Sequence, residues 1–133
     1  MFDESKIKHL EFIQSIITRM ASNSFMLKGW AITVVAALLA YSIKEQNPYV
    51  LSVILFPAIV FALLDMYYLY QERLFRKLYD KVREQVETDF AMSTEDFKKD
   101  VKYWPCLKSP SIYAFYVPIV VLLITMAIII LIA

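Results

Sequence analysis

One aspartate lies inside a long apolar run, and its depth there makes it the strongest candidate for a chemical role. Asp65 comes 17 residues after Pro48, where an apolar run begins. A helix rises about 1.5 Å per residue, so Asp65 would lie ~26 Å from the start of that helix, just inside a hydrocarbon core of ~30 Å. A charge at that depth is costly and usually marks a partner or a function. Lys28, at the start of an earlier apolar run, should reach the same depth, so we predict that it pairs with Asp65.

Two interpretations of this pair are open from the sequence. A plain ion pair would fix the register of two helices. Alternatively, Asp65 would belong to an ion path or a gate, because ionisable residues inside membrane spans commonly mark such paths.

The residue types on which zinc sites, disulfides and phosphate-binding loops most depend each occur once. The chain has one His (His9), one Cys (Cys106) and one Gly (Gly29). One His and one Cys cannot build a zinc site of the usual kind, and one Cys cannot form a disulfide within the chain. One Gly excludes a phosphate-binding loop and a nucleophile elbow. We therefore expect no catalytic centre, no metal and no cofactor, and we favour a role in binding, transport or pore formation.

The composition places the chain among membrane proteins. Of its 133 residues, 59% are hydrophobic and the net charge is +1, whereas a soluble domain is about half apolar. Runs over residues 25–43, 48–70 and 111–133 are each long enough to cross a bilayer as a helix. Asn47 as a cap and Pro48 as the first helical residue predict where the second helix begins. We predict an all-α membrane protein, one domain over residues 1–133, with three transmembrane helices.

Three helical segments are predicted outside these spans. Residues 3–23 carry apolar side chains at spacings of three and four, which is typical of an amphipathic helix that packs on other helices. The second span has no stop signal, so its helix should continue over residues 71–92 into the cytoplasm. A capping box predicts a short helix over residues 94–103.

The predicted cytoplasmic extension carries an apolar stripe at nearly coiled-coil spacing. Its members are Phe75, Leu78, Val82, Val86 and Phe90. An apolar stripe on a lone helix is unfavourable in water, so this one should meet the N-terminal helix, the segment around Phe97 or another subunit.

The distribution of Lys and Arg predicts the orientation. Four of them precede or begin the first span, one lies between the first and second spans, and nine lie between the second and third. The positive-inside rule then places the N-terminus in the cytoplasm and the C-terminus outside. Aromatic residues gather at the predicted inner boundary, as an interfacial belt does. They are Trp30, Tyr67, Tyr68, Tyr70, Tyr103, Trp104, Tyr113 and Tyr116.

Two further sets of residues are candidate contact surfaces. Cations that follow the second span form a basic collar, which would meet anionic lipid, a nucleotide or oligonucleotide, or a partner protein. The collar is Arg73, Arg76, Lys77, Lys81 and Arg83. Small residues of the first span form a seam that lets helices approach closely, either within the chain or between subunits. The seam is Gly29, Thr33, Ala36, Ala37 and Ala40.

Two stretches of the sequence resemble a known family. The first holds Glu11-Phe12-Ile13-Gln14, Arg19-Met20-Ala21, Asn23-Ser24-Phe25 and Lys28-Gly29-Trp30. The second holds Leu64-Asp65, Tyr67-Tyr68 and Gln71-Glu72-Arg73-Leu74-Phe75-Arg76-Lys77-Leu78-Tyr79-Asp80. They resemble a family of small bacterial membrane proteins that are similar to SLATT-type anti-phage defence effectors and to the channel subunits of Hailong-type systems.

The resemblance implies a multi-pass protein of the bacterial inner membrane that assembles as a homo-oligomeric ion channel or pore and depolarises the membrane. In that family, control comes from a nucleotide or oligonucleotide signal or from the protein that makes it, and direct binding of duplex DNA is not expected. The third span departs from the two-span effectors, so the resemblance does not identify the helix that lines the pore. A non-conducting membrane anchor or scaffold that docks a cytosolic partner is the alternative.

Overall fold

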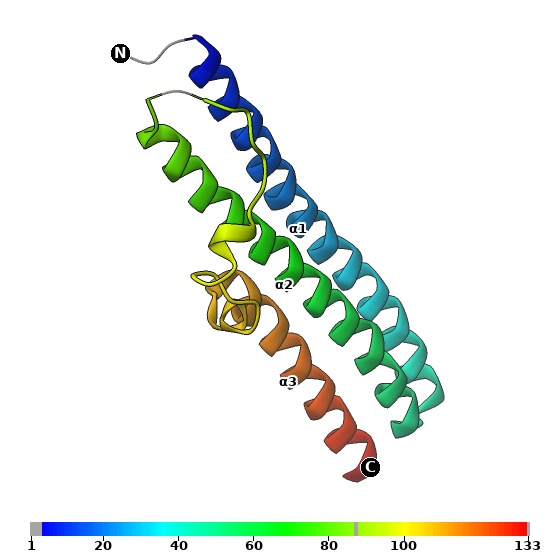
Figure 1. The fold of residues 1–133 in the computed structure, drawn as a ribbon. Coiled ribbons are helices and arrows are strands. Elements are labelled where there is room, and N and C mark those ends of the chain that lie inside the picture. The colour runs from blue at the N-terminus through cyan, green and yellow to red at the C-terminus, as the bar shows by residue number, and fades with distance from the viewer. Residues whose placement is uncertain (1–3, 87, 133) are drawn as a thin grey trace.

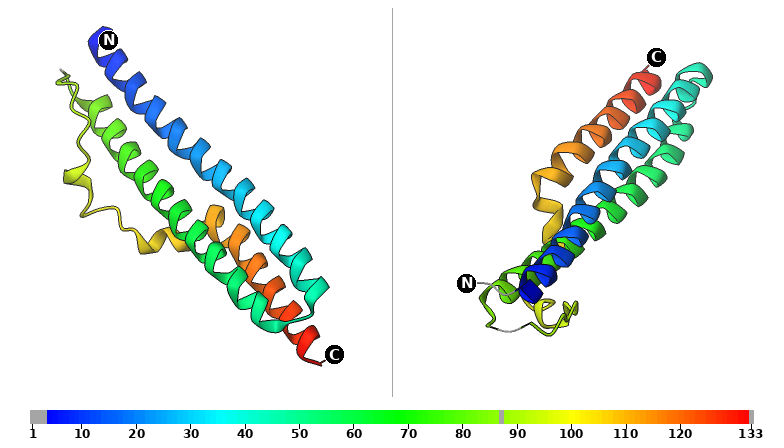
Figure 2. Two further views of the ribbon diagram at one scale, coloured as in Figure 1. Left: turned by 90° about the vertical axis from the view of Figure 1, so that its right-hand side faces the viewer. Right: turned by 90° about the horizontal axis from the view of Figure 1, so that it is seen from above.

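The chain folds into a long helical hairpin with a third helix beside one end of it. This is seen in a computed structural model that describes residues 4–86 and 88–132, in which every regular element is helical (Figure 1). The elements are α1 (Glu4–Glu45), α2 (Pro48–Glu84), the 3₁₀ turns η1 (Glu95–Phe97) and η2 (Trp104–Lys108), and α3 (Pro110–Ile132). α3 lies along the end of the hairpin that holds the α1–α2 turn (Figure 2).

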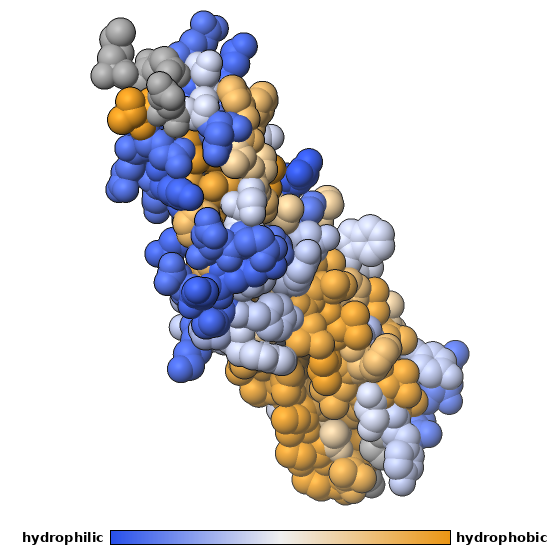
Figure 3. All heavy atoms as spheres, in the orientation of Figure 1, coloured by the Kyte–Doolittle hydropathy of each residue, from blue (hydrophilic) through white to orange (hydrophobic). Residues whose placement is uncertain are grey.

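All three α-helices are long and apolar enough to cross a membrane. The surface divides accordingly: orange, apolar side chains cover the end of the molecule that contains α3, and blue, polar side chains cover the opposite end (Figure 3). We call these ends the apolar half and the charged half. The three predicted spans lie in the apolar half, so the prediction of an all-helical chain with three candidate spans is confirmed.

The turn between α1 and α2 follows the predicted capping pattern. Gln46 has a φ of 52°, the left-handed conformation that commonly ends a helix. The side-chain oxygen of Asn47 then accepts a hydrogen bond of 3.0 Å from the backbone N–H of Tyr49. Pro48 is the first residue of α2, where its missing N–H costs nothing. The second span thus begins where the sequence predicts.

The predicted amphipathic helix and first span form one helix rather than two. α1 runs from Glu4 to Glu45 without interruption, and the predicted limits at residues 3 and 133 lie outside the described part of the chain. Between the two segments Asn23 and Ser24 are weak helix formers, but packing overrides that local preference. Buried residues recur at seven-residue spacing through this region, as in a coiled coil, and they include Leu10, Ile17, Ser24 and Ala31.

The predicted continuation of the second helix over residues 71–92 is wrong at its end. α2 stops at Glu84, and Gln85 is already extended, with ψ of 145°. Beyond it, the Thr88 hydroxyl accepts from the backbone N–H of Phe90 at 3.2 Å, and the Asp89 carboxylate accepts from that of Ala91 at 3.0 Å. Such local side-chain bonds compete with helix formation. The Ala91 bond also lowers the pKa of the Asp89 carboxyl below its ordinary value.

The predicted short helix over residues 94–103 is also wrong in extent. Only residues 95–97 are helical there, as the single 3₁₀ turn η1, and Thr94 makes no capping bond with its side chain. The Ser93 hydroxyl accepts from the backbone N–H of Glu95 at 3.4 Å, which closes a local turn instead of opening a full helix. The second turn, η2, is not predicted by the sequence pattern.

The middle of the apolar stripe is covered within the chain. Leu78 and Val82 are buried in a cluster with three residues of α1, namely Leu10, Ile13 and Ile17. Phe75 packs against this cluster from α2, and Met92 and Phe97 cover it from the segment that follows. The stripe thus meets two of the three partners predicted for it. Placing Val86 and Phe90 on its helix is wrong, since both follow the end of α2 and Val86 is 90% exposed.

His9, to which the sequence pattern assigns no role, holds the segment after α2 against α1. Its ring is fully buried and lies 5.5 Å from the ring of Phe90. The Nε2 atom lies 2.8 Å from the carbonyl oxygen of Ala91 and donates a hydrogen bond to it. The Nδ1 atom is hydrogen-bonded to the hydroxyl of Thr88. One side chain therefore fastens both sides of a turn to the N-terminal part of the hairpin.

His9→Ala should loosen this turn. The change removes two hydrogen bonds and a buried ring, and we expect a local loss of about 1–3 kcal/mol. Hydrogen exchange of the amides at residues 88–92 should then accelerate by roughly 10-fold or more, since about 1.4 kcal/mol is a factor of ten. Lys8→Ala, at the exposed neighbouring position, is the matched control. Equal exchange rates in the two variants would contradict the role assigned to His9.

Candidate functional site

The structure brings Lys28 and Asp65 together, as their depths predict. The Lys28 Nζ atom lies 2.5 Å from the Asp65 Oδ2 atom. The Asp65 side chain is fully buried and that of Lys28 is 17% exposed. An isolated buried carboxylate is very costly in an apolar environment, and the cation in direct contact offsets part of the cost of burying Asp65.

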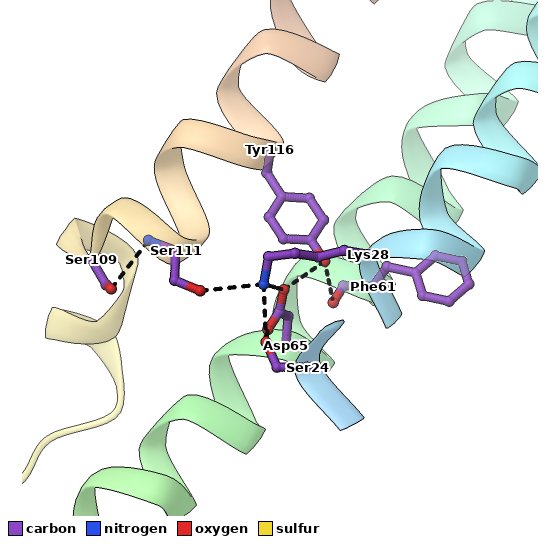
Figure 4. A network of polar contacts seen from close by, with 7 residues as sticks. All are labelled: Ser24, Lys28, Phe61, Asp65, Ser109, Ser111 and Tyr116. Carbon is purple, nitrogen blue, oxygen red and sulfur yellow. Dashed lines mark hydrogen bonds and ion pairs between the residues drawn. The ribbon is translucent and has the colours of Figure 1, made fainter. Parts of the chain in front are cut away.

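The Asp65 carboxylate has partners on both of its oxygen atoms (Figure 4). The hydroxyl of Ser24 donates to Oδ1. The hydroxyl of Tyr116 lies 3.0 Å from Oδ2 and 3.3 Å from the carbonyl oxygen of Phe61. The carboxylate is therefore held by a cation and two hydroxyl groups, the kind of full satisfaction that a buried polar network needs to be stable.

The Lys28 ammonium extends the network to a third helix. Besides Asp65, its Nζ atom donates to the Ser24 hydroxyl at 2.9 Å and to the Ser111 hydroxyl at 3.3 Å (Figure 4). It also lies 5.8 Å from the centre of the Phe115 ring, within the range of a cation–π contact. These contacts connect α1 and α2 to α3 at one level of the bundle.

The sequence predicts the two charges of this network but not its hydroxyl groups. Ser24 is four residues before Lys28, so helical periodicity places the two on one face of α1 and is a signal for Ser24. No comparable signal exists for Ser111 and Tyr116, because the packing of α3 against the hairpin is not encoded in local spacing. We refer to Ser24, Lys28, Asp65, Ser111 and Tyr116 as the charge network.

The charge network is suited to holding helices rather than to nucleophilic chemistry. A Ser–Lys pair acts as a nucleophile and base only when the amine can take up a proton. Here the Lys28 ammonium is paired with Asp65, and the Ser24 hydroxyl donates to the same carboxylate. The arrangement thus stabilises a charge pair that joins three helices.

The small-residue seam faces away from the rest of the chain. All five of its members, Gly29, Thr33, Ala36, Ala37 and Ala40, are exposed. A Cβ atom added at Gly29 would meet no atom within 4 Å. The buried face of α1 holds Ser24, Ala31, Val35 and Ser42 instead, and at about 100° per residue the seam lies on the opposite side of the helix. Of the two predicted uses, packing within the chain is therefore wrong.

The basic collar is only partly neutralised by nearby acids. Arg76 pairs with Glu72 at 2.8 Å, and wider pairs of 3.8 and 3.9 Å connect Lys81 to Asp96 and Arg83 to Asp80. The remaining collar residues, Arg73 and Lys77, line a hollow between α2 and the segment that follows it. The hollow is lined by Arg73, Arg76, Lys77, Asp80, Asp100, Val101, Lys102 and Pro105.

Cys106 is buried beside this hollow. Its Sγ atom lies 3.6 Å from Nη1 of Arg73. Burial raises the pKa of the Cys106 thiol, and the neighbouring guanidinium acts in the opposite direction. A buried thiol with a raised pKa is typically unreactive. Within residues 4–86 and 88–132, no three His, Cys, Asp or Glu side chains gather where they could hold a metal ion.

Comparisons with known proteins add no relative. No protein-family model, curated protein or solved structure matches this chain. The described residues form an all-helical fold with three helices that are long and apolar enough to cross a membrane, which suggests contact with a lipid bilayer.

Proposed function

We propose that the chain is one subunit of a homo-oligomeric pore or ion channel. In this proposal it lies in the bacterial inner membrane with its charged half in the cytoplasm, and it acts as a defence effector that depolarises the membrane. A nucleotide signal or a partner protein controls it through the charged half. No enzymatic activity is part of the proposal.

The observation that carries the proposal is the exposure of the whole small-residue seam. In lipid there is little hydrophobic drive between helices, so close approach at small residues is a main source of association. The five seam residues lie in the apolar half, on the face of α1 turned away from α2. That face suits a neighbouring subunit.

The interior of one subunit supports an assembly rather than a single-chain pore. The space between its helices is filled by buried side chains, among them Ala31, Ile54 and Leu123. A conducting path would then run between subunits. This is consistent with a seam that faces outwards.

The hairpin offers a physical route from the charged half to the membrane. Both α1 and α2 are continuous from one half to the other, so a ligand that shifts the charged half also shifts the spans. The charge network fastens α3 to the hairpin through Ser111 and Tyr116. We propose that this connection is the gate.

The test is ion flux through liposomes that contain the purified, assembled protein. We expect a membrane potential to be lost in vesicles with the protein and kept in vesicles without it. Asp65→Asn should weaken the connection to α3. A weakening of ~1.4 kcal/mol would change the rate of ion leak by about 10-fold. Thr125→Val is the control, because it also removes a polar group from the apolar half but lies outside the charge network.

Two outcomes would count against this function. An assembled oligomer that never conducts, with or without added nucleotides, would favour the anchor. Normal assembly with an unchanged leak in Asp65→Asn would remove Asp65 from the gate.

A membrane anchor that docks a cytosolic protein is the second candidate, and the structure gives it less support. Its docking surface would be the predicted helix over residues 75–90, which carries the apolar stripe. Leu78 and Val82 of that stripe are buried against α1, and Phe97 covers the same cluster. Of the stripe, Val86 and Phe90 remain exposed for a partner.

A further inference from the structure

A hollow of about 400 Å³ lies between α2 and the return segment, by which we mean residues 88–109. Most of its charged lining is cationic. The lining cations are Arg73, Arg76, Lys77 and Lys102. Two carboxylates, Asp80 and Asp100, also line it, so the hollow keeps an excess of positive charge. Positive potential concentrated in a concave site attracts an anion.

Much of this charge has no acid beside it. Among the described residues, Arg73, Lys77 and Lys102 form no ion pair with a carboxylate. Arg73 is half-buried, and within the described part of the chain its one hydrogen-bond partner is the thiol of Cys106, which is a weak acceptor. A guanidinium has five N–H donors and favours planar, paired contacts with phosphate or carboxylate oxygens. Arg73 therefore has unused capacity for an anionic ligand.

The depth of Arg73 matches the phosphate layer of a bilayer. Arg73 comes 25 residues after Pro48, which is about 37 Å along the helix. With the usual tilt of ~20° this is ~35 Å of depth, about 5 Å beyond a ~30 Å hydrocarbon core that begins at Pro48. The headgroup layers increase the total bilayer thickness to ~40–45 Å. The hollow therefore opens within the headgroup layer.

The neighbouring turn η2 has the character of an interfacial anchor. Trp104 is 68% exposed and Leu107 is 51% exposed. The hydroxyl of Tyr103 donates to the carbonyl oxygen of Leu63 at 2.7 Å, which holds the turn against the end of the apolar part of α2. Trp and Tyr favour the membrane interface, where a ring contacts acyl chains and its polar end contacts headgroups. The turn therefore places the hollow beside lipid.

From its charge, depth and surroundings, we propose that this hollow binds the phosphate headgroup of an anionic phospholipid. Arg73 makes paired hydrogen bonds to the phosphate oxygens, and Lys77 and Lys102 add charge. The Asp80 and Asp100 carboxylates disfavour a ligand with several phosphates, because like charges repel. The proposal does not depend on ion conduction, since a lipid can bind a subunit of a pore or an anchor alike.

The test is a titration of the purified full chain, in a neutral detergent, with short-chain phosphatidylglycerol. Binding should raise the melting temperature, as a ligand specific for the folded state does, and the same concentration of short-chain phosphatidylcholine should not. Arg73→Gln and Lys102→Gln should each raise the Kd for phosphatidylglycerol by about 10-fold or more, as expected when one cation of the phosphate site is lost. Lys99→Gln changes an exposed lysine of the same segment outside the hollow and should leave the Kd unchanged.

The outcomes separate the alternatives. Equal effects of the two lipids, or equal Kd values for Lys102→Gln and Lys99→Gln, would overturn the proposal. Since Lys102 is exposed, its variant should fold even if Arg73→Gln does not, and the helical signal in circular dichroism verifies this.

Inorganic phosphate and adenosine monophosphate form a second arm of the test. If either competes at concentrations similar to those of the lipid, the hollow would be reassigned to a soluble phosphate ester. None of these readouts depends on ion flux, so a failed leak assay leaves the result standing.

Discussion

Replacing Lys28 by Met should lower the free energy of unfolding by about 3–5 kcal/mol, the typical cost of removing one partner from a buried ion pair. Asp65 would keep its two hydroxyl partners but lose its only ion pair among the described residues. Because the carboxylate is fully buried and the Lys28 side chain is 17% exposed, water replaces the ammonium poorly. The destabilisation should therefore be among the largest for any single substitution in the chain.

Two further variants identify the source of this effect. Asp65→Asn should cost less than Lys28→Met, since the amide oxygen still accepts from Ser24 and the remaining ammonium is partly exposed. The double variant Lys28→Met/Asp65→Asn should also be more stable than Lys28→Met alone, because no unpaired charge is left buried. The measurement is unfolding by a denaturing detergent in mixed micelles, followed by circular dichroism. Lys44→Met, an exposed lysine of the same helix, is the control, and a loss as large in this control would refute the argument.

Helix positions and the ion pair could be predicted from the sequence because both follow from local rules. The start of α2 is fixed by Asn47 and Pro48, whose capping chemistry involves adjacent residues. The depth of Asp65 follows from a count of residues and a constant rise per residue. A charge at that depth needs a partner, and Lys28 was the cation available at the same level.

The end of α2 and the role of His9 could not be predicted, because they depend on contacts between residues that are far apart in the sequence. Residues 85–92 contain good helix formers, so their local preference is helical. The turns built by Thr88 and Asp89 override it, and His9 stabilises them from a position 79 residues away from Thr88. Contacts at that separation leave no periodic signal in the chain.

The side of α1 that packs on α2 could not be predicted from the sequence, because both faces of that helix are apolar. In a helix surrounded by lipid, hydrophobic periodicity no longer distinguishes the buried face from the outer one. Small residues favoured the seam, but α2 packs instead on Ala31 and Val35. Ser24 contributes to the buried face through its bond to Asp65. Both faces carry small residues, so residue size does not distinguish them, and the bond from Ser24 to Asp65 is what marks the inner face.

Because all five seam residues are exposed, assembly and folding should respond separately to changes in the seam. We predict that Ala36→Leu combined with Ala40→Leu leaves the unfolding free energy within about 0.5 kcal/mol of the original chain, as surface substitutions do. At a close helix–helix contact each added side chain should cost about 1–3 kcal/mol, so subunit association should weaken by roughly 100-fold or more. Analytical ultracentrifugation in detergent measures this shift, and the leak from liposomes should fall with it.

Ala114→Leu is the matched control, since it makes the same change at an exposed position of α3. If Ala114→Leu dissociates the assembly while the seam variant does not, the subunit interface lies on α3 and the seam faces lipid. If the seam variant unfolds, its outer face supports the subunit itself. We expect the seam variant to dissociate into folded subunits, while Ala114→Leu stays assembled. That result matches a geometry in which α1 packs one face on its own hairpin and the opposite face on a neighbouring subunit.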